Sequence, residues 1–240
     1  MLGGPALQIV ILAGGLGTRL RPLTERMPKC IAPVNGRPFL DHQLRLLARH
    51  GVRDVVLCIG YLGQAILKAF GSGHQLGVQI TYSWERDRLL GTAGAIRNAA
   101  PLLAPEFFVT YGDTLLLLDY RAIMRRFLEA DALAMMVVHR NHDRLERSNV
   151  VVEDGRVVAY DKTASLPGMV FINEGLSVLR RQALRLIPEG VPVSEEEFYG
   201  ALIARGELLA YETDQRFYEI GSPAGLEEFQ RLAAEGAFER

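Results

Sequence analysis

Short apolar runs alternate with longer amphipathic stretches along the first 140 residues of the chain. Five runs rich in β-branched or aromatic residues predict buried strands: Gln8–Leu12, Asp54–Ile59, Val78–Tyr82, Phe107–Tyr111 and Ala132–His139. Four stretches with apolar residues at helical spacing predict helices: Pro38–Gly51, Gln64–Phe70, Ala93–Leu103 and Tyr120–Ala130. Strands that alternate with helices pair in parallel through right-handed crossovers, so this half predicts a wound parallel sheet.

The pattern changes in the second half of the chain. Val150–Glu153 and Arg156–Tyr160 flank Asp154-Gly155, a dipeptide that strongly favours a tight hairpin. Met169–Ile172 predicts one further strand. These segments indicate a small antiparallel annex to the parallel sheet.

Two helices complete the predicted fold. Ser194 begins a capping-box sequence for a helix that ends near Arg205, and a last helix begins near Ser222. No internal repeat or linker interrupts the chain. We therefore expect residues 1–240 to form a single α/β domain with a Rossmann-like, doubly wound, mostly parallel mixed sheet.

The composition narrows the classes of function. Lys and Arg number 27 against 28 Asp and Glu, so no strongly basic field is present to bind nucleic acid. The longest apolar runs fall far short of the roughly 18 residues that a membrane span needs. Cys30 and Cys58 have no metal or redox spacing and are expected to be reduced and buried. The N-terminus lacks the basic region of a signal peptide, so we expect a cytoplasmic protein.

A glycine-rich loop after the first predicted strand is the sharpest feature of the sequence. Gly14, Gly15 and Gly17 let backbone N–H groups point inward around an anion, and Arg19 and Lys29 add positive charge. Catalysis on a triphosphate depends mainly on positioning and charge stabilisation, which this arrangement supplies. A tight turn with surface cations is the alternative explanation.

Two better-known phosphate-binding motifs do not fit the loop. A dinucleotide-binding fingerprint that starts at Gly15 requires a small residue where Leu20 stands. A P-loop requires Gly-Lys-Ser/Thr after four spacers from the first glycine, where this chain has Arg19 and Leu20. The loop therefore matches neither motif.

Together with segments farther along the chain, the loop resembles the signature of the sugar-1-phosphate nucleotidylyltransferases. The segments are GLGTRLRPLT (15–24), PK (28–29), VNGRPFL (34–40), GTAGA (91–95), YGD (111–113) and FYEIGSP (217–223). They span nearly the whole chain, and the short single-domain members look most similar. These are first the D-glycero-D-manno-heptose 1-phosphate guanylyltransferases and second the N-acetylmuramate 1-phosphate uridylyltransferases. The resemblance implies the nucleotide-diphospho-sugar transferase fold.

The resemblance also implies a reaction and its catalytic residues. A sugar 1-phosphate oxygen would attack the α-phosphorus of an NTP, with Arg19, Lys29 and Asp113 as catalytic residues. No general base is required, because the attacking phosphate, with its second pKa near 6, is already an anion at about pH 7. The residues implied in nucleotide binding are Leu12, Ala13, Gly14, Gly15, Gly17, Thr18, Arg19, Glu85, Gly91, Thr92 and Asp113.

Mg²⁺ is the cofactor that the resemblance implies. From the local sequence, Asp113 could equally cap a turn or bind a metal, and the resemblance favours the metal. Glu219 is the implied second ligand, either directly or through water. It stands where relatives have an aspartate, so its longer side chain would reach differently.

A second group of residues is implied in sugar-phosphate binding. Lys162 follows the predicted hairpin and matches the family's cation for the sugar phosphate, although a solvated hairpin charge would look the same. Asn173, Glu174 and Gly175 match the family's sugar contact, with Glu174 as the hydroxyl acceptor. Asn149 stands where many relatives have a glycine, which puts one backbone contact to the sugar in doubt.

The choice of base rests on residues 84–90, which by resemblance line the base pocket. Guanine presents two neighbouring N–H donors that suit a carboxylate, and this segment contains Glu85 and Asp87 but no glutamine. We therefore expect GTP, with UTP as the alternative. Either Glu85 or Arg86 could face the base.

The remaining alternative is a regulatory protein that keeps the fold without catalysis. Such a protein would be expected to lose the cationic and carboxylate positions, and Arg19, Lys29, Asp113 and Lys162 are all present. The substrates, an NTP and a sugar 1-phosphate, are then the implied partners, without nucleic acid or membrane. Homo-oligomerisation stays open.

Overall fold

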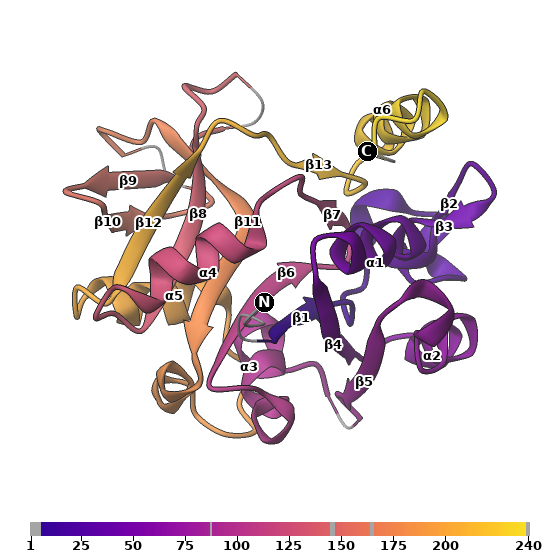
Figure 1. The fold of residues 1–240 in the computed structure, drawn as a ribbon, viewed down its shortest axis with the longest axis horizontal. Coiled ribbons are helices and arrows are strands. Elements are labelled where there is room, and N and C mark those ends of the chain that lie inside the picture. The colour runs from indigo at the N-terminus through magenta and orange to yellow at the C-terminus, as the bar shows by residue number, and fades with distance from the viewer. Residues whose placement is uncertain (1–5, 87, 145–146, 164–165, 239–240) are drawn as a thin grey trace, which may run out of the picture.

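A computed structural model describes residues 6–86, 88–144, 147–163 and 166–238 of the chain. Within these residues one nine-stranded mixed sheet crosses the molecule (Figure 1). In spatial order its strands are β5 (Gln79–Trp84), β4 (Val52–Ile59), β1 (Leu7–Leu12), β6 (Glu106–Tyr111), β11 (Phe171–Arg180), β8 (Ala134–Arg140), β12 (Leu208–Thr213), β10 (Arg156–Tyr160) and β9 (Val150–Glu153). Only β10 and β11 run against the others, which confirms the mostly parallel mixed sheet.

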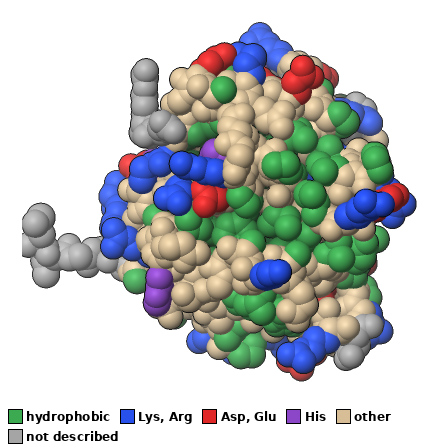
Figure 2. Space-filling view, turned by 90° about the vertical axis from the view of Figure 1, so that its right-hand side faces the viewer, with side chains coloured by type: hydrophobic (Ala, Val, Ile, Leu, Met, Phe, Trp, Pro, Cys, Tyr) green, Lys and Arg blue, Asp and Glu red, His purple; other side chains and the backbone are tan. Residues whose placement is uncertain are grey.

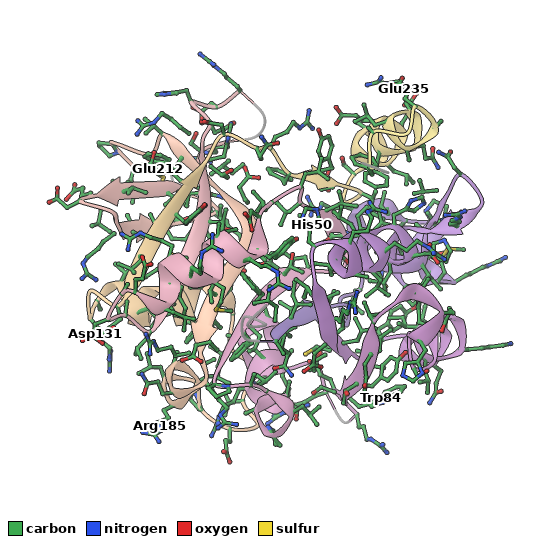
Figure 3. All side chains as sticks on the ribbon, in the orientation of Figure 1. His50, Trp84, Asp131, Arg185, Glu212 and Glu235 are labelled. Atoms are coloured by element: carbon green, nitrogen blue, oxygen red, sulfur yellow. The ribbon has the colours of Figure 1, made fainter. Side chains whose placement is uncertain are left out.

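The strand directions are visible in the left half of the molecule. Asp131, which precedes β8, and Arg185, which follows β11, both lie at the lower left, whereas Glu212 near the end of β12 lies at the upper left (Figure 3). β8 and β12 therefore run upward and β11 runs downward between β6 and β8. The hairpin β9–β10 extends the same sheet at its edge.

Helices cover both faces of the sheet because strand side chains alternate between two apolar clusters. Ile9 and Ile11 of β1 enter one cluster and Val10 enters the other. The first cluster packs under α1 (Phe39–Arg49), α2 (Gly63–Phe70) and α4 (Tyr120–Leu128), and the second under α3 (Gly91–Asn98) and α5 (Glu195–Ile203). This is the doubly wound arrangement that the sequence predicts.

A third apolar cluster attaches the C-terminal helix α6 (Pro223–Ala234) to α1. The ring of Phe229 lies 4.8 Å from that of Phe39 and 4.5 Å from that of Phe238, measured between centroids. Two short ribbons lie in this region: β2 (Pro33–Val34) with β3 (Arg37–Pro38), and β7 (Thr114–Leu115) with β13 (Tyr218–Glu219). The β7–β13 ribbon connects the end of β6 to the start of α6.

Three sequence predictions differ from the structure. The strand expected at Met169–Ile172 is the long strand β11, which occupies the middle of the sheet. The strand β12 was not expected at all. The helix expected at Ala93–Leu103 ends at Asn98 and continues as a 3₁₀ turn, because Pro101 has no N–H to donate and its ring obstructs a helical carbonyl.

Figure 2 shows a face on which apolar side chains gather from the centre to the right, with charged side chains both around this area and inside it. No helix in the described ranges is long and apolar enough to span a bilayer. Homo-oligomerisation stays a prediction.

Candidate active site

A cavity of about 340 Å³ opens where β1 and β6 end. Its lining includes every residue that the sequence implicates in nucleotide binding: Leu12, Ala13, Gly14, Gly15, Gly17, Thr18, Arg19, Glu85, Gly91, Thr92 and Asp113. Lys29 lines it as well. The residues come from three separate parts of the chain and meet at the carboxyl edge of the parallel strands, where open α/β sheets bind ligands.

The glycine loop has little space for side chains at two of its three glycines. A Cβ on Gly14 would lie 2.7 Å from Glu85 Oε1 and 3.1 Å from the nitrogen of Gly60. Gly17 has a φ of 61°, in the left-handed region that favours glycine, and its Cβ would lie 2.8 Å from Thr24 Cγ2. The loop therefore keeps its backbone exposed to the cavity.

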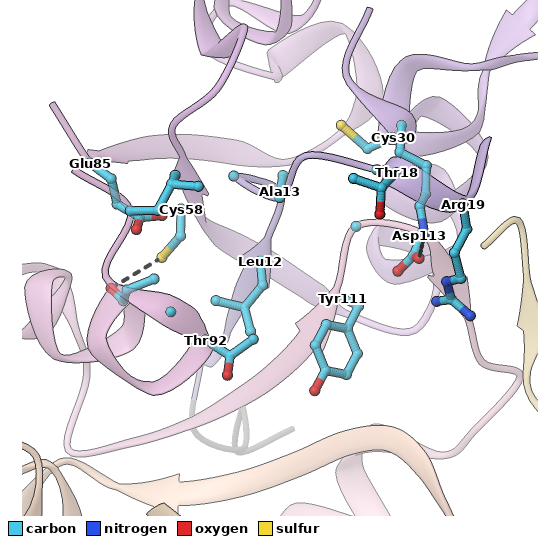
Figure 4. A pocket seen from close by; sticks show the side chains of 18 residues that line it. Leu12, Ala13, Thr18, Arg19, Cys30, Cys58, Glu85, Thr92, Tyr111 and Asp113 are labelled. Atoms are coloured by element: carbon cyan, nitrogen blue, oxygen red, sulfur yellow. Dashed lines mark hydrogen bonds and ion pairs between the residues drawn. The ribbon is translucent and has the colours of Figure 1, made fainter. Parts of the chain in front are cut away.

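Arg19, Lys29 and Asp113 lie together at one end of the cavity. Lys29 Nζ forms an ion pair with Asp113 Oδ2, and both side chains are largely buried. Figure 4 shows Arg19 beside Asp113, with its guanidinium group extended past it. A Cβ on Gly221 would lie 3.1 Å from Arg19 Nη2, so this guanidinium group reaches the loop before α6.

Glu85 lies at the opposite end of the cavity from Arg19 (Figure 4). Its Oε2 accepts a hydrogen bond of 2.6 Å from the Leu90 N–H, and burial raises the pKa of the carboxyl above its ordinary value. Arg86 is not among the residues that line the cavity, and Asp87 lies outside the described residues. Of the two candidates for the base pocket, Glu85 is the one that faces the cavity.

Cys30 and Cys58 also line the cavity, although both are buried. The Cys58 thiol donates to the carbonyl of Ala95 over 3.6 Å. Burial raises the pKa of each thiol to about 12. Both cysteines are therefore protonated near neutral pH, in agreement with the reduced, buried side chains expected from the sequence.

The residues implicated in sugar-phosphate binding are only partly brought together. Asn173 and Gly175 line a small pocket of about 10 Å³ that shares Leu12, Thr92 and Tyr111 with the main cavity. Lys162 Nζ lies 5.9 Å from the centroid of the Tyr111 ring.

Glu174 does not line either of these two cavities. It is 1% exposed, and neither carboxylate oxygen has a hydrogen-bond partner within the described ranges. Burial raises its pKa to about 8. The Phe217 N–H is near enough to offset part of that rise, as is the charge of Arg216, but this N–H does not meet the geometry of a hydrogen bond. Gly175 has a φ of 78° and the register of β11 with β8 shifts between Asn173 and Ser177, so the strand is irregular here and Glu174 is buried apart from the pocket that its neighbours line. Its expected contact with the sugar stays a prediction.

Asn149 has hydrogen-bond partners within the protein at its backbone and at its side chain. Its N–H donates to the carbonyl of Phe171 over 2.8 Å, and its Oδ1 accepts from the Asn173 N–H over 3.0 Å. This N–H therefore already has a partner within the protein, and the doubt about a backbone contact to the sugar stays a prediction.

The backbone at Glu219 lies next to that of Asp113, but the Glu219 carboxylate is hydrogen-bonded to the loop before α6. Ile220 N donates to the carbonyl of Asp113 over 3.0 Å. The Glu219 carboxylate accepts from the Gly221 N–H and, over 2.9 Å, from the hydroxyl of Ser222, the N-cap of α6. In the described part of the chain, no group of three or more His, Cys, Asp or Glu side chains could hold a metal ion.

Glu195 and Tyr111 are site residues that the sequence analysis did not single out. Glu195 lines the small pocket and forms an ion pair with Lys162, but in the sequence it belongs to a helix-capping segment. Tyr111 lines both cavities. The one sequence feature that could have pointed to Tyr111 is its position at the end of β6, directly before Gly112 and the expected site residue Asp113.

The comparisons with known proteins agree with this geometry. A family model described as nucleotidyl transferase matches residues 8–159. The chain is 35% identical over 232 residues to a mannose-1-phosphate guanylyltransferase of Mycobacterium tuberculosis, covering 94% of this chain and 63% of that one. It is 30% identical over 217 residues to a D-glycero-alpha-D-manno-heptose 1-phosphate guanylyltransferase of Campylobacter jejuni, covering 90% of this chain and 96% of that one.

A solved structure, HddC from Yersinia pseudotuberculosis complexed with GMP-PN, has a TM-score of 0.77 and 27% identity, covering 94% of this chain and 98% of that one. The fold is thus the α/β fold of the nucleotidyl transferases. The chain belongs to the nucleotidyl transferase family. The resemblance to sugar-1-phosphate nucleotidylyltransferases is confirmed.

The raised thiol pKa values predict unreactive cysteines. With a pKa of about 12, each thiol is a thiolate in roughly one molecule in ten thousand at pH 8. We expect iodoacetamide at pH 8 to leave Cys30 and Cys58 unmodified in the folded protein and to alkylate both in urea, as measured by mass spectrometry. Alkylation of the folded protein at the rate of the unfolded chain would contradict the burial described here.

Proposed function

We propose that this protein joins GTP to a sugar 1-phosphate, with a manno-heptose 1-phosphate as the preferred sugar, and releases pyrophosphate. The observation that carries the proposal is the polarity of the main cavity. Arg19 and Lys29 lie at one end and the Glu85 carboxylate at the other, and the glycine loop runs between them from Gly14 beside Glu85. GTP complements this arrangement. Its negatively charged phosphates match the cationic end, and the N–H donors of its guanine base match the carboxylate.

The phosphate end of the site supplies positive charge from two side chains and from the loop backbone. Backbone N–H groups of the loop suit phosphate oxygens, and the guanidinium and ammonium groups of Arg19 and Lys29 balance their charge. Lys29 now pairs with Asp113, so a bound triphosphate would share this lysine with the carboxylate. These cations hold the charge that develops on the leaving pyrophosphate.

The reaction needs no base from the protein. An oxygen of the sugar phosphate forms a bond to the α-phosphorus, and the bond from that phosphorus to the bridging oxygen of pyrophosphate breaks. The attacking oxygen is already anionic, because the second phosphate pKa is about 6. Lys162 lies on the side of Tyr111 from which the sugar phosphate would approach.

Asp113 fits a bound Mg²⁺, because this ion usually takes one or two protein carboxylates and fills the other positions with water and phosphate oxygens. Both carboxylate oxygens of Glu219 already accept a hydrogen bond from the loop before α6, one from the Gly221 N–H and one from the Ser222 hydroxyl. When bound, the ion would neutralise phosphate charge during transfer. We therefore propose Asp113 as the direct ligand and assign Glu219 to ordering the loop before α6.

One observation supports the preference for GTP, and a second, independent one supports the preference for a heptose. The Glu85 carboxylate lies at the base end of the cavity, where it can accept both N–H groups of guanine. The heptose enzyme of Campylobacter jejuni is matched over 96% of its length, whereas the chain spans only 63% of the mannose enzyme.

A pyrophosphate-release assay with Mg²⁺ tests the proposal. The four NTPs are crossed with mannose, glucose, N-acetylmuramate and manno-heptose 1-phosphates. We expect release only when an NTP and a sugar 1-phosphate are both present, and fastest with GTP and the heptose. A preference for UTP overturns the base assignment, and binding of NTPs without any release favours a regulatory protein.

The role of Glu85 is tested by Glu85→Gln. An amide offers guanine one acceptor and one donor in place of two acceptors, so we expect kcat/KM for GTP to fall by about tenfold or more while kcat/KM for UTP is unchanged or rises. Glu129→Gln, at the exposed C-terminus of α4, is the matched control and should behave as wild type. Equal losses with GTP and UTP would show that Glu85 has a purely structural role.

A further inference from the structure

Lys162 has a fixed carboxylate partner. Its Nζ forms an ion pair with Glu195 Oε1, in which the lysine side chain is 44% exposed and the glutamate side chain 8%. Lys162 follows β10 on the chain and Glu195 is the first residue of α5, so the pair joins two separate elements. A lysine at the end of a hairpin would otherwise sample many rotamers, and this contact restricts it.

Glu195 is itself held from a second side. The Tyr160 hydroxyl donates to Glu195 Oε1 over 2.7 Å. The Tyr160 ring packs edge-on against Tyr199 at 5.5 Å between centroids, and the Tyr199 hydroxyl lies 2.8 Å from the Ser177 hydroxyl. The carboxylate therefore has a rigid setting inside the protein, and Lys162 is the more exposed partner.

The helix does not need this carboxylate for its own stability. Ser194 and Glu197 already form a complete capping box at the start of α5. Burying a carboxyl group costs free energy, and that burial raises the pKa of Glu195 to about 8. A buried Glu195 is thus better explained by its contact with Lys162 than by helix formation.

The contact directs Lys162 toward the reacting groups. Lys162 Nζ lies 5.9 Å from the Tyr111 ring centroid, and Tyr111 lines both the nucleotide cavity and the small pocket. The charges of Arg19 and Asp113 also act on Lys162. The ammonium group is therefore near the catalytic groups.

We propose that Glu195 is a positioning residue for the sugar 1-phosphate. It holds Lys162 so that one N–H of the ammonium group points at the carboxylate and the other two remain for the phosphate. The inference rests on the proposed function, because the phosphate that Lys162 would bind is that of the sugar substrate. Glu195 acts through Lys162 and does not contact the reacting atoms.

The charges around Lys162 fix the sign of a pH effect. Burial lowers the pKa of Lys162, Arg19 lowers it further, and Glu196 and Asp113 raise it. The adjoining Tyr160 and Tyr111 hydroxyls are uncharged near neutral pH. Because burial raises the pKa of Glu195 to about 8, its carboxylate is charged mainly above that pH, and there it is a negative neighbour of Lys162. Removing it therefore lowers the pKa of Lys162 in the alkaline range. Binding of the sugar phosphate, which needs the charged lysine, is then lost at lower pH than in wild type.

The test compares Glu195→Gln with Glu196→Gln, two adjacent substitutions that make the same chemical change. Only Glu195 has a direct contact with Lys162 among the contacts described. We expect Glu195→Gln to raise the KM for the sugar 1-phosphate by about tenfold, to leave the KM for the NTP unchanged, and to move the alkaline limb of kcat/KM to lower pH. Glu196→Gln removes a charge that raises the pKa of Lys162 but no contact with it, so this variant also moves the alkaline limb. Near neutral pH we expect it to change neither KM by more than about twofold, which makes the KM for the sugar 1-phosphate the readout that separates the two variants.

Three further measurements separate the outcomes. Glu195→Asp keeps the charge but withdraws it by one methylene, so its KM for the sugar 1-phosphate should lie between wild type and Glu195→Gln. If Glu195→Gln fails to fold by thermal unfolding, Glu195→Asp and Tyr160→Phe carry the test. Equal behaviour of the Glu195 and Glu196 variants overturns the positioning role. Absence of activity in wild type overturns the proposed function instead.

Discussion

The parallel pairing of β1 with β6 is the constraint on which the site depends. Leu12 pairs with Tyr111 at the ends of these strands, and the Gly112 N–H donates to the carbonyl of Leu12 over 3.0 Å. The glycine loop and the Gly112-Asp113 turn therefore leave the sheet side by side. A Cβ on Gly112 would lie 3.2 Å from that of Ala13, so glycine is what allows this approach.

The electrostatics of the site follow from that placement. Strand pairing brings Asp113 to Lys29, and the two charges neutralise each other within a largely buried setting. Arg19 adds positive charge at the same end, while Glu85 and the Lys162–Glu195 pair lie at the edges where the base and the sugar phosphate would bind. Tyr111 stands between the two cavities. Two substrates could thus approach from different sides and meet beside Asp113.

The sequence predicted what local patterns control. The β1–β6 half has compact apolar runs and clear helix signals. Its glycine loop lines the cavity, as do all the other residues that the sequence analysis expected in nucleotide binding. β11 was predicted as a short strand because Asn173, Glu174 and Gly175 interrupt its apolar pattern, and its register with β8 shifts at this point. The orientations of Glu174 and Glu219 depend on neighbours that sequence spacing does not reveal: the segment at Phe217 and the N-terminus of α6.

A crystal structure of the protein with Mg²⁺ and a non-hydrolysable GTP analogue tests the central claim most directly. The account predicts the guanine edge on the Glu85 carboxylate, the phosphates along Gly14–Gly17 with Arg19, and the metal ion on Asp113. The phosphates bound elsewhere on the protein, or the base turned away from Glu85, would contradict it.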